Sequence, residues 1–184
     1  MSKGENGGPC AQCNALCCRN YSVCLTAHDL QRLFKKTGRL DWAAAAKAES
    51  VKNPPFHSFF LFEKGIFKEY FLCLARDASE ACVFLGEKNK CVVYSSRPTV
   101  CRMYPFELDS TGSLKYKKNH RCPVLWKLGG QEVERFLADA RQRQRELDDY
   151  GVWCREWNAL HARKKGLKSF LKFLLGKAKE EGEH

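Results

Sequence analysis

Residues 10–18, CAQCNALCC, place four cysteines within nine residues. A packed core has no need for cysteines at this density. Thiolates are soft ligands that favour zinc, copper(I) or iron–sulfur clusters, and the two-residue gap between Cys10 and Cys13 lets both bind one ion from a single turn of backbone. The stretch therefore predicts a metal centre around which the rest of the chain is organised.

Two adjacent cysteines, Cys17 and Cys18, close this stretch. Neighbouring side chains diverge by about 100° on a helix and about 180° on a strand, so we expect one of the two to bind a second metal or another atom of a polynuclear cluster. Such a centre requires further ligands from elsewhere in the chain. Four cysteines at suitable places are Cys82, Cys91, Cys101 and Cys122.

The bulk properties agree with an intracellular metalloprotein. A chain of 184 residues suits one domain, or one domain with an appended element. Eleven cysteines, without an apolar leader or a run of about 18 apolar residues, predict a cytoplasmic protein with reduced thiols. Cysteines at short spacings in that compartment more often bind metal or catalyse than form disulfides. The formal net charge of +11 would suit nucleic acid, an acidic membrane or an acidic partner, and composition does not choose among them.

The chain begins with a polar, glycine-rich segment, residues 1–9, that we expect to be a flexible tail. After the cysteines, Thr26 with Asp29 three positions later predicts a helix that ends at Gly38. An alanine-rich run predicts a second helix over residues 40–50.

Aromatic and β-branched residues then predict strands at about residues 67–75, 82–85, 91–94 and 114–117. A turn at residues 86–90 would bring Cys82 and Cys91 together across the base of a hairpin. The remaining cysteines, which we interpret as small core residues, are Cys24, Cys73 and Cys154.

The segment RPTVCRMYPF, residues 97–106, predicts a short helix that carries Cys101 and is bounded by prolines. Arg97 and Arg102 flank this cysteine. Cationic donors beside a metal–thiolate centre offset its negative charge and can hydrogen-bond sulfur, although surface salt bridges are the alternative role. Farther on, His120 precedes Cys122 by two residues. We favour Cys122 as the ligand and His120 as its neighbour or replacement.

The C-terminal part is helical by its apolar periodicity from residue 129 onward, with Gly151 as a candidate break. Residues 161–179 hold seven lysines and arginines and no acidic residue, and they predict a basic amphipathic helix. Its apolar face would either dock on the protein's own core or serve a protein partner or an anionic membrane surface.

These motifs give the chain a resemblance to YkgJ-type cysteine-cluster proteins, the zinc- or iron-chelating CxxCxxCC family, over about residues 10–125. The resemblance rests on the opening cluster, on LTAHDLQRL, on CVFLGEKNKC and on RPTVCRMYPF. One departure is that three residues, rather than two, separate Cys13 from the adjacent pair. The resemblance implies zinc or iron, including iron–sulfur, bound by Cys10, Cys13, Cys17, Cys18, Cys82, Cys91, Cys101 and Cys122.

The expected fold class is α+β: a small cysteine-rich metal-binding domain with short helices and a hairpin or small antiparallel sheet, followed by amphipathic helices. The expected division is a tail at residues 1–9, the metal-binding domain at 10–125 and a helical extension at 126–184.

The expected function is metal binding in a structural role or as an electron or metal carrier. We favour iron–sulfur over zinc because all eight candidate ligands are sulfur, the adjacent pair suits a polynuclear centre, and two arginines could tune it. The alternative is an enzyme or enzyme component, either redox or similar to the lysine N-methylases that some relatives resemble. No catalytic residue is assigned. Mixed charges and the lack of a base-reading zinc-finger spacing argue against nucleic acid.

Overall fold

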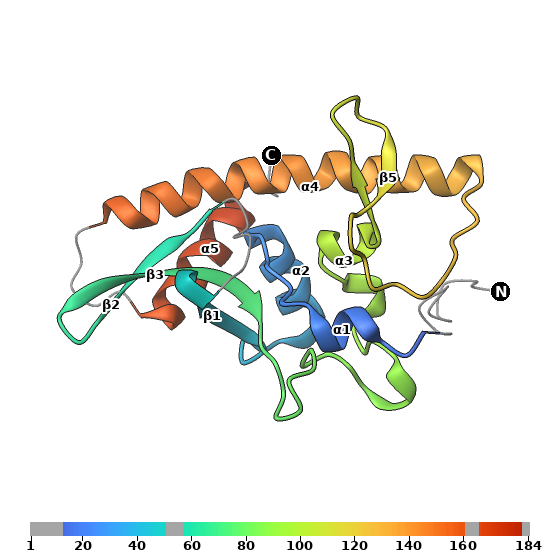
Figure 1. Ribbon diagram of the computed structural model, residues 1–184. Coiled ribbons are helices and arrows are strands. Elements are labelled where there is room, and N and C mark those ends of the chain that lie inside the picture. The colour runs from blue at the N-terminus through green and yellow to red at the C-terminus, as the bar shows by residue number, and fades with distance from the viewer. Residues whose placement is uncertain (1–12, 51–56, 161–165, 182–184) are drawn as a thin grey trace. The chain divides into compact units, whose positions relative to one another are not determined.

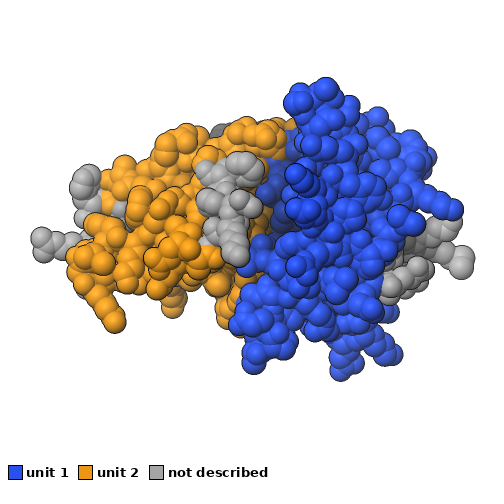
Figure 2. Space-filling view, viewed as in Figure 1, with its two compact units in different colours: residues 1–23, 76–143 blue, residues 24–75, 144–184 orange. Residues whose placement is uncertain are grey.

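The computed structural model describes residues 13–50, 57–160 and 166–181 (Figure 1). They form helices and two small antiparallel sheets, so the predicted α+β class is confirmed. The chain divides into two compact units, coloured separately in Figure 2: unit 1 comprises residues 1–23 and 76–143, and unit 2 comprises residues 24–75 and 144–184. Each unit thus combines two segments that are far apart in sequence. The expected division at residues 10, 125 and 126 stays a prediction, because compactness groups residues by contact rather than by function.

Unit 2 contains a three-stranded antiparallel sheet in the order β1-β3-β2, formed by β1 (Ala43–Lys47), β2 (Phe59–Glu63) and β3 (Ile66–Leu74). The predicted strand at 67–75 corresponds to β3. The predicted helix at 40–50 is wrong, since this run forms β1 and a short 3-10 turn, η2 (Ala48–Ser50). Alanine favours a helix by less than about 1 kcal/mol per residue over most residues, and pairing along five positions of β3 outweighs that preference.

Helix α2 (Ala27–Thr37) has the predicted limits. The Thr26 hydroxyl accepts a hydrogen bond from the Asp29 N–H, and the Asp29 carboxylate accepts one from the Thr26 N–H, which completes a capping box. Gly38 ends the helix in the left-handed conformation, with φ of 68°. Leu30 and Leu33 of α2 are fully buried.

Helix α5 (Leu167–Glu181) packs in the same unit and contacts α2. Its Phe170 ring stacks on Phe59 of β2 at a centroid distance of 3.8 Å, and Phe170 and Leu174 are fully buried. The described part of the predicted basic helix therefore turns its apolar face to the core of its own unit. Residues 161–165 of that prediction lie outside the described residues.

Helix α4 (Gly130–Ala159) runs without interruption through Gly151, and the boundary between the units falls inside it, between Arg143 and Gln144. Gly151 is not the break that the sequence suggested. A Cβ at this position would lie 2.6 Å from ring atoms of His57, so the glycine permits a close approach of that side chain.

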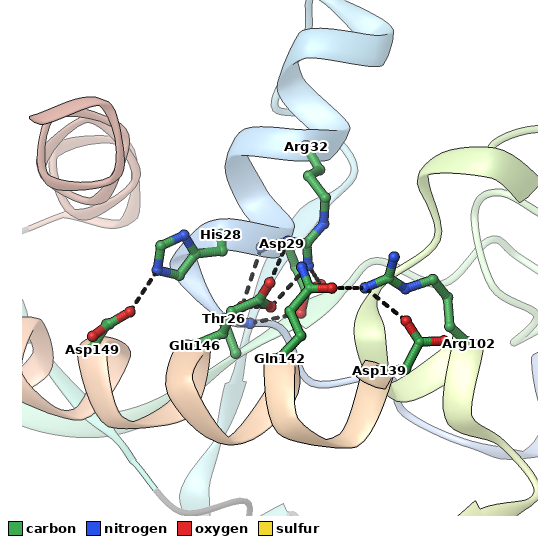
Figure 3. A network of polar contacts seen from close by, with 9 residues as sticks. All are labelled: Thr26, His28, Asp29, Arg32, Arg102, Asp139, Gln142, Glu146 and Asp149. Carbon is green, nitrogen blue, oxygen red and sulfur yellow. Dashed lines mark hydrogen bonds and ion pairs between the residues drawn. The ribbon is translucent and has the colours of Figure 1, made fainter. Parts of the chain in front are cut away.

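Polar contacts tie the unit 2 part of α4 to α2 (Figure 3). Arg32 donates to both carboxylate oxygens of Glu146, and the Thr26 hydroxyl donates to Glu146 Oε2 at 3.3 Å. Arg32 also pairs with Asp29. Glu146 is only 5% exposed, so the network satisfies a buried carboxylate. Nearby in the chain, His28 contacts Asp149 at 2.9 Å.

Unit 1 is built from short elements, which are α1 (Leu16–Asn20), η3 (Glu87–Asn89), η4 (Tyr94–Ser96), α3 (Thr99–Met103), β4 (Phe106–Leu108) and β5 (Leu114–Tyr116). Strands β4 and β5 pair antiparallel, which confirms the strand predicted at 114–117. Residues 82–85 and 91–94 form turns joined by one isolated bridge, Leu85 to Cys91, rather than the two strands predicted. Buried Phe106 packs against Trp126 and Phe136 to form an aromatic core.

Two turns of unit 1 have the same construction. In the first, Asp77 Oδ1 accepts hydrogen bonds from the N–H and hydroxyl of Ser79 and from the Ala81 N–H. In the second, residues 109–113, Asp109 Oδ1 accepts the equivalent three bonds. The fourth position is left-handed in both: Glu80 has φ of 59° and Gly112 has φ of 78°. The first turn ends next to Cys82 and so helps to position that thiol.

Across the described ranges, no helix combines the length and apolar character needed to cross a membrane.

Candidate metal centre

Unit 1 holds seven of the eight cysteines predicted as ligands, and the eighth, Cys10, lies outside the described residues. Helix α1 carries Cys17 and Cys18, and α3 carries Cys101. The other four lie in loops and turns and are Cys13, Cys82, Cys91 and Cys122.

The opening segment folds back on itself before α1. Ala15 is buried and adopts φ of 54°, a conformation that costs a residue with a Cβ about 1–2 kcal/mol. Its N–H donates to Cys13 Sγ at 3.1 Å. The reversal therefore keeps the Cys13 sulfur beside the start of the helix that carries Cys17 and Cys18.

The adjacent thiols converge instead of diverging. Cys17 Sγ and Cys18 Sγ lie 3.9 Å apart. Two thiolates bound tetrahedrally to one zinc at about 2.3 Å would be about 3.8 Å apart, so adjacency in sequence does not prevent these two sulfurs from sharing an ion.

Their protonation differs. A hydrogen bond from the Cys18 thiol, then backbone N–H groups of Cys18 and Cys17 and last the charge of Arg97, lower the pKa of Cys17 to about 7. The contact between the two thiols and burial raise the pKa of Cys18. Cys17 is thus the more acidic of the two thiols, and the one that loses its proton to a metal more readily.

Backbone contacts bring the second cysteine segment to the first. The Cys82 N–H donates to the Cys18 carbonyl at 2.8 Å. An antiparallel bridge pairs Cys91 with Leu85, three residues after Cys82, and so returns the chain toward Cys82. Burial raises the pKa of Cys82, and the charges of Cys91 and Cys17 act in the same direction. Cys82 and Cys101 likewise raise the pKa of Cys18. Thiols from three separate segments are therefore electrostatic neighbours.

Cys122 has a different environment. The Trp126 indole N–H donates to Cys122 Sγ at 3.5 Å. His120 stacks on Tyr116 at a centroid distance of 4.9 Å, and its Nδ1 is buried without a hydrogen-bond partner in the part of the chain that the structure describes. An imidazole nitrogen without a hydrogen-bond partner has the lone pair that a metal ligand needs.

The two flanking arginines have different contacts. Arg97 Nε donates to the Tyr94 carbonyl at 3.0 Å, its guanidinium lies over the Tyr94 ring, and its charge reaches Cys17. Arg102 Nη2 contacts Gln142 at 2.8 Å and Asp139 at 3.3 Å on the unit 1 part of α4 (Figure 3). The charge of Arg97 thus acts on one thiol, and the contacts of Arg102 with Gln142 and Asp139 anchor α3 to α4. The expected role of both arginines beside a metal centre stays a prediction.

Arg76 organises the site, although nothing in the sequence pointed to it. It donates to the backbone carbonyls of Tyr21 at 2.9 Å and Arg19 at 2.8 Å, and also to that of Glu80. One side chain thus ties the C-terminal end of α1 to the turn before Cys82. In the sequence, Arg76 is marked only by its place beside Asp77, and many arginines have such a neighbour without any such role.

A family model for CxxCxxCC, described as a putative zinc- or iron-chelating domain, matches residues 9–123. The chain belongs to the CxxCxxCC family. This match confirms the resemblance drawn from the motifs. No solved structure matches the chain.

The CxxCxxCC assignment supports a zinc- or iron-binding role, and the donor set of unit 1 fits such a metal chemically. Its thiols are soft ligands, and one of them has a pKa of about 7. Among the described residues, no three His, Cys, Asp or Glu side chains are arranged to hold one ion. Which of the eight cysteines bind metal, and in what grouping, stays a prediction.

Proposed function

We propose that unit 1 binds iron or zinc through the thiolates of the CxxCxxCC cysteines and serves as a structural centre or as a carrier of electrons or metal. The observation that carries the proposal is the 3.9 Å contact between the Cys17 and Cys18 sulfurs, beside which a backbone hydrogen bond to Cys18 holds Cys82, a residue more than 60 positions later. The predicted ligands are Cys10, Cys13, Cys17, Cys18, Cys82, Cys91, Cys101 and Cys122.

Iron–sulfur is our preferred form of the centre. Every predicted ligand is sulfur, and the charge of Arg97 acts on Cys17, as expected of a cation that stabilises an anionic cluster. Anaerobic purification followed by an absorption spectrum and metal and sulfide analysis tests this form. A brown protein with iron and acid-labile sulfide is expected, and a colourless protein with stoichiometric zinc would replace iron–sulfur with zinc.

Ligand variants test the assignment of the cysteines. Cys17→Ser and Cys18→Ser are each expected to lower the metal content, because both thiols lie among the cluster cysteines. Cys73→Ala and Cys154→Ala are matched controls, since both cysteines are buried in unit 2 and neither is a predicted ligand. Equal metal loss from ligand and control variants that keep their fold would contradict the assignment.

An enzyme built on the same centre is the alternative, and coordination distinguishes the two. A catalytic zinc keeps one exchangeable position, whereas a structural site is closed by four protein ligands. X-ray absorption spectroscopy of the metal-loaded protein measures the number of sulfur ligands. Four sulfurs per ion supports a closed centre, and three sulfurs with one oxygen supports an open one.

Partner binding through residues 161–179 remains a proposal with a narrower basis, because Phe170 and Leu174 already pack in unit 2. Lys168 and Lys172 are exposed, so binding to an anionic membrane or protein surface would rest on their positive charges. Reversing both to Glu should abolish salt-sensitive binding to anionic vesicles, and the same reversal at Lys35 and Lys36 of α2 is the control. This role is contradicted if the unaltered protein does not bind vesicles, or if the variant with Glu at 168 and 172 still binds them.

We also propose a cytoplasmic location.

A further inference from the structure

A second pair of cysteines lies in unit 2, apart from the predicted metal ligands. Cys24 and Cys73 face each other across an antiparallel bridge, and their Sγ atoms are 3.0 Å apart. Non-bonded heavy atoms prefer separations of about 3.5–4.0 Å, and sulfur is larger than carbon. The two sulfurs are therefore closer than a simple packing contact requires.

The backbone at this pair suits a covalent link. The Leu25 N–H donates to the Leu72 carbonyl at 2.8 Å, which makes the adjacent Cys24–Cys73 pair one of the non-hydrogen-bonded type. Opposed residues of this type have Cα atoms about 4.5 Å apart, within the range of about 4.4–6.8 Å that disulfides span. A bond between the sulfurs would need only small side-chain rotations.

The two thiols differ in access, which gives them different roles in an exchange reaction. Cys24 is half-buried, whereas Cys73 is only 3% exposed. A reagent from solvent therefore meets Cys24 first.

We propose that Cys24 and Cys73 form a thiol–disulfide exchange site for a low-molecular-weight disulfide of the oxidised glutathione type. The Cys24 thiolate attacks one sulfur of the reagent, the S–S bond of the reagent breaks, and one glutathione thiolate leaves. Cys73 then attacks the Cys24 sulfur and releases the second glutathione. Two electrons pass from the cysteine pair to the reagent, and the two thiol protons end on two glutathione molecules.

The bond would join residues next to two of the three points at which the chain passes from one unit to the other. Cys24 is the first residue of unit 2, and Cys73 lies two residues before Ala75, where the first segment of that unit ends. Oxidation would therefore close unit 2 at the two points where its first segment begins and ends. This site does not depend on the proposed metal function.

Peptide mapping of the full-length, metal-loaded protein tests the proposal. Trypsin is expected to release residues 20–32 and 69–76 as peptides that contain one cysteine each, Cys24 and Cys73. After treatment with oxidised glutathione and alkylation of the remaining thiols, the two peptides should appear joined, with the loss of two hydrogen atoms. Unoxidised protein should give both peptides alkylated.

Single variants expose the order of the steps. In Cys73→Ser, Cys24 should stop as a mixed disulfide with glutathione, because the resolving thiol is missing. In Cys24→Ser, buried Cys73 should stay reduced. Cys154→Ala should still form the joined peptides.

Three results would overturn the proposal. The first is that both peptides of the unaltered protein stay reduced after treatment. The second is that its Cys24 remains a glutathione adduct while Cys73 stays reduced. The third is that Cys24→Ser and Cys73→Ser lose bound metal. The last result would assign the pair to metal binding instead. A protein that binds no metal but forms the joined peptides would contradict the proposed function alone, so the two failures are distinguishable. If a variant does not fold, peptide mapping of the unaltered protein still tests whether the Cys24–Cys73 disulfide forms.

Discussion

Gly112 tests the cost of a left-handed residue in the second Asp turn. Its φ is 78°, and a Cβ there would meet no atom within 4 Å, so Gly112→Ala changes only the backbone preference. We expect the free energy of unfolding to fall by about 1 kcal/mol. Gly176→Ala in α5 is the matched control, because that site is also open but helical, and it should stabilise by about 0.5–1 kcal/mol. Urea unfolding measures both, and a stabilising Gly112→Ala would contradict the assigned conformation.

The same turns make a prediction about protonation. The Ser79 hydroxyl and then the Ala81 N–H lower the pKa of Asp77 below 3.8, and Thr111 and Ser113 do the same for the pKa of Asp109. Because the folded pKa is depressed, the turns stabilise the protein fully above about pH 4 and lose this contribution as pH falls through the folded value.

Substitution of Ser79 separates the two turns. Ser79→Ala should raise the pKa of Asp77 toward 3.8, because it removes the largest cause of the shift, and should leave the pKa of Asp109 unchanged. NMR titration of the carboxyl carbons gives both values in one sample. An unmoved Asp77 midpoint would show that the hydroxyl bond is not the cause.

At the scale of elements, the link between α2 and α4 in unit 2 depends on Glu146. Glu146→Gln leaves the Arg32 charge facing a neutral amide in a nearly buried site, and we expect a loss of about 2–3 kcal/mol in unfolding free energy. Asp149→Asn is the control one turn away. Its carboxylate is 34% exposed and contacts His28, so the loss should stay below about 1 kcal/mol. Equal losses, measured by urea unfolding, would mean that burial does not set the strength of these contacts.

Elements also differ in how far the sequence predicted them. Helix α2 carries its own start and stop in Thr26, Asp29 and Gly38, and its limits follow from those residues alone. Strand β1 has no comparable signal. Four alanines suit a helix locally, yet the free edge of β3 pairs with them, and that edge is created by residues some 25 positions later. A preference of tenths of a kcal/mol per residue could not reveal this.

At the scale of the whole molecule, metal removal should affect the two units unequally. Every predicted ligand among the described residues belongs to unit 1. A chelator should therefore speed amide exchange in residues 13–23 and 76–143 before the described residues of unit 2, which are 24–50, 57–75, 144–160 and 166–181. Loss of protection should stop within α4 near Arg143 and Gln144. Hydrogen exchange followed by mass spectrometry measures this, and uniform loss along the chain would contradict a metal-bearing unit.

The sequence by itself determined the chemistry of the candidate centre. Cysteine spacing, the proline-bounded helix of Cys101 and the capping box of α2 are local patterns, and local patterns survive without knowledge of the fold. Tertiary structure decided the rest. The backbone contact of Cys82 with Cys18, the hydrogen bonds of Arg76 to Arg19 and Tyr21, and the approach of Cys24 to Cys73 all join residues about 50 or more positions apart. Such contacts depend on how sheet register and turns close the chain, and no single segment encodes that closure.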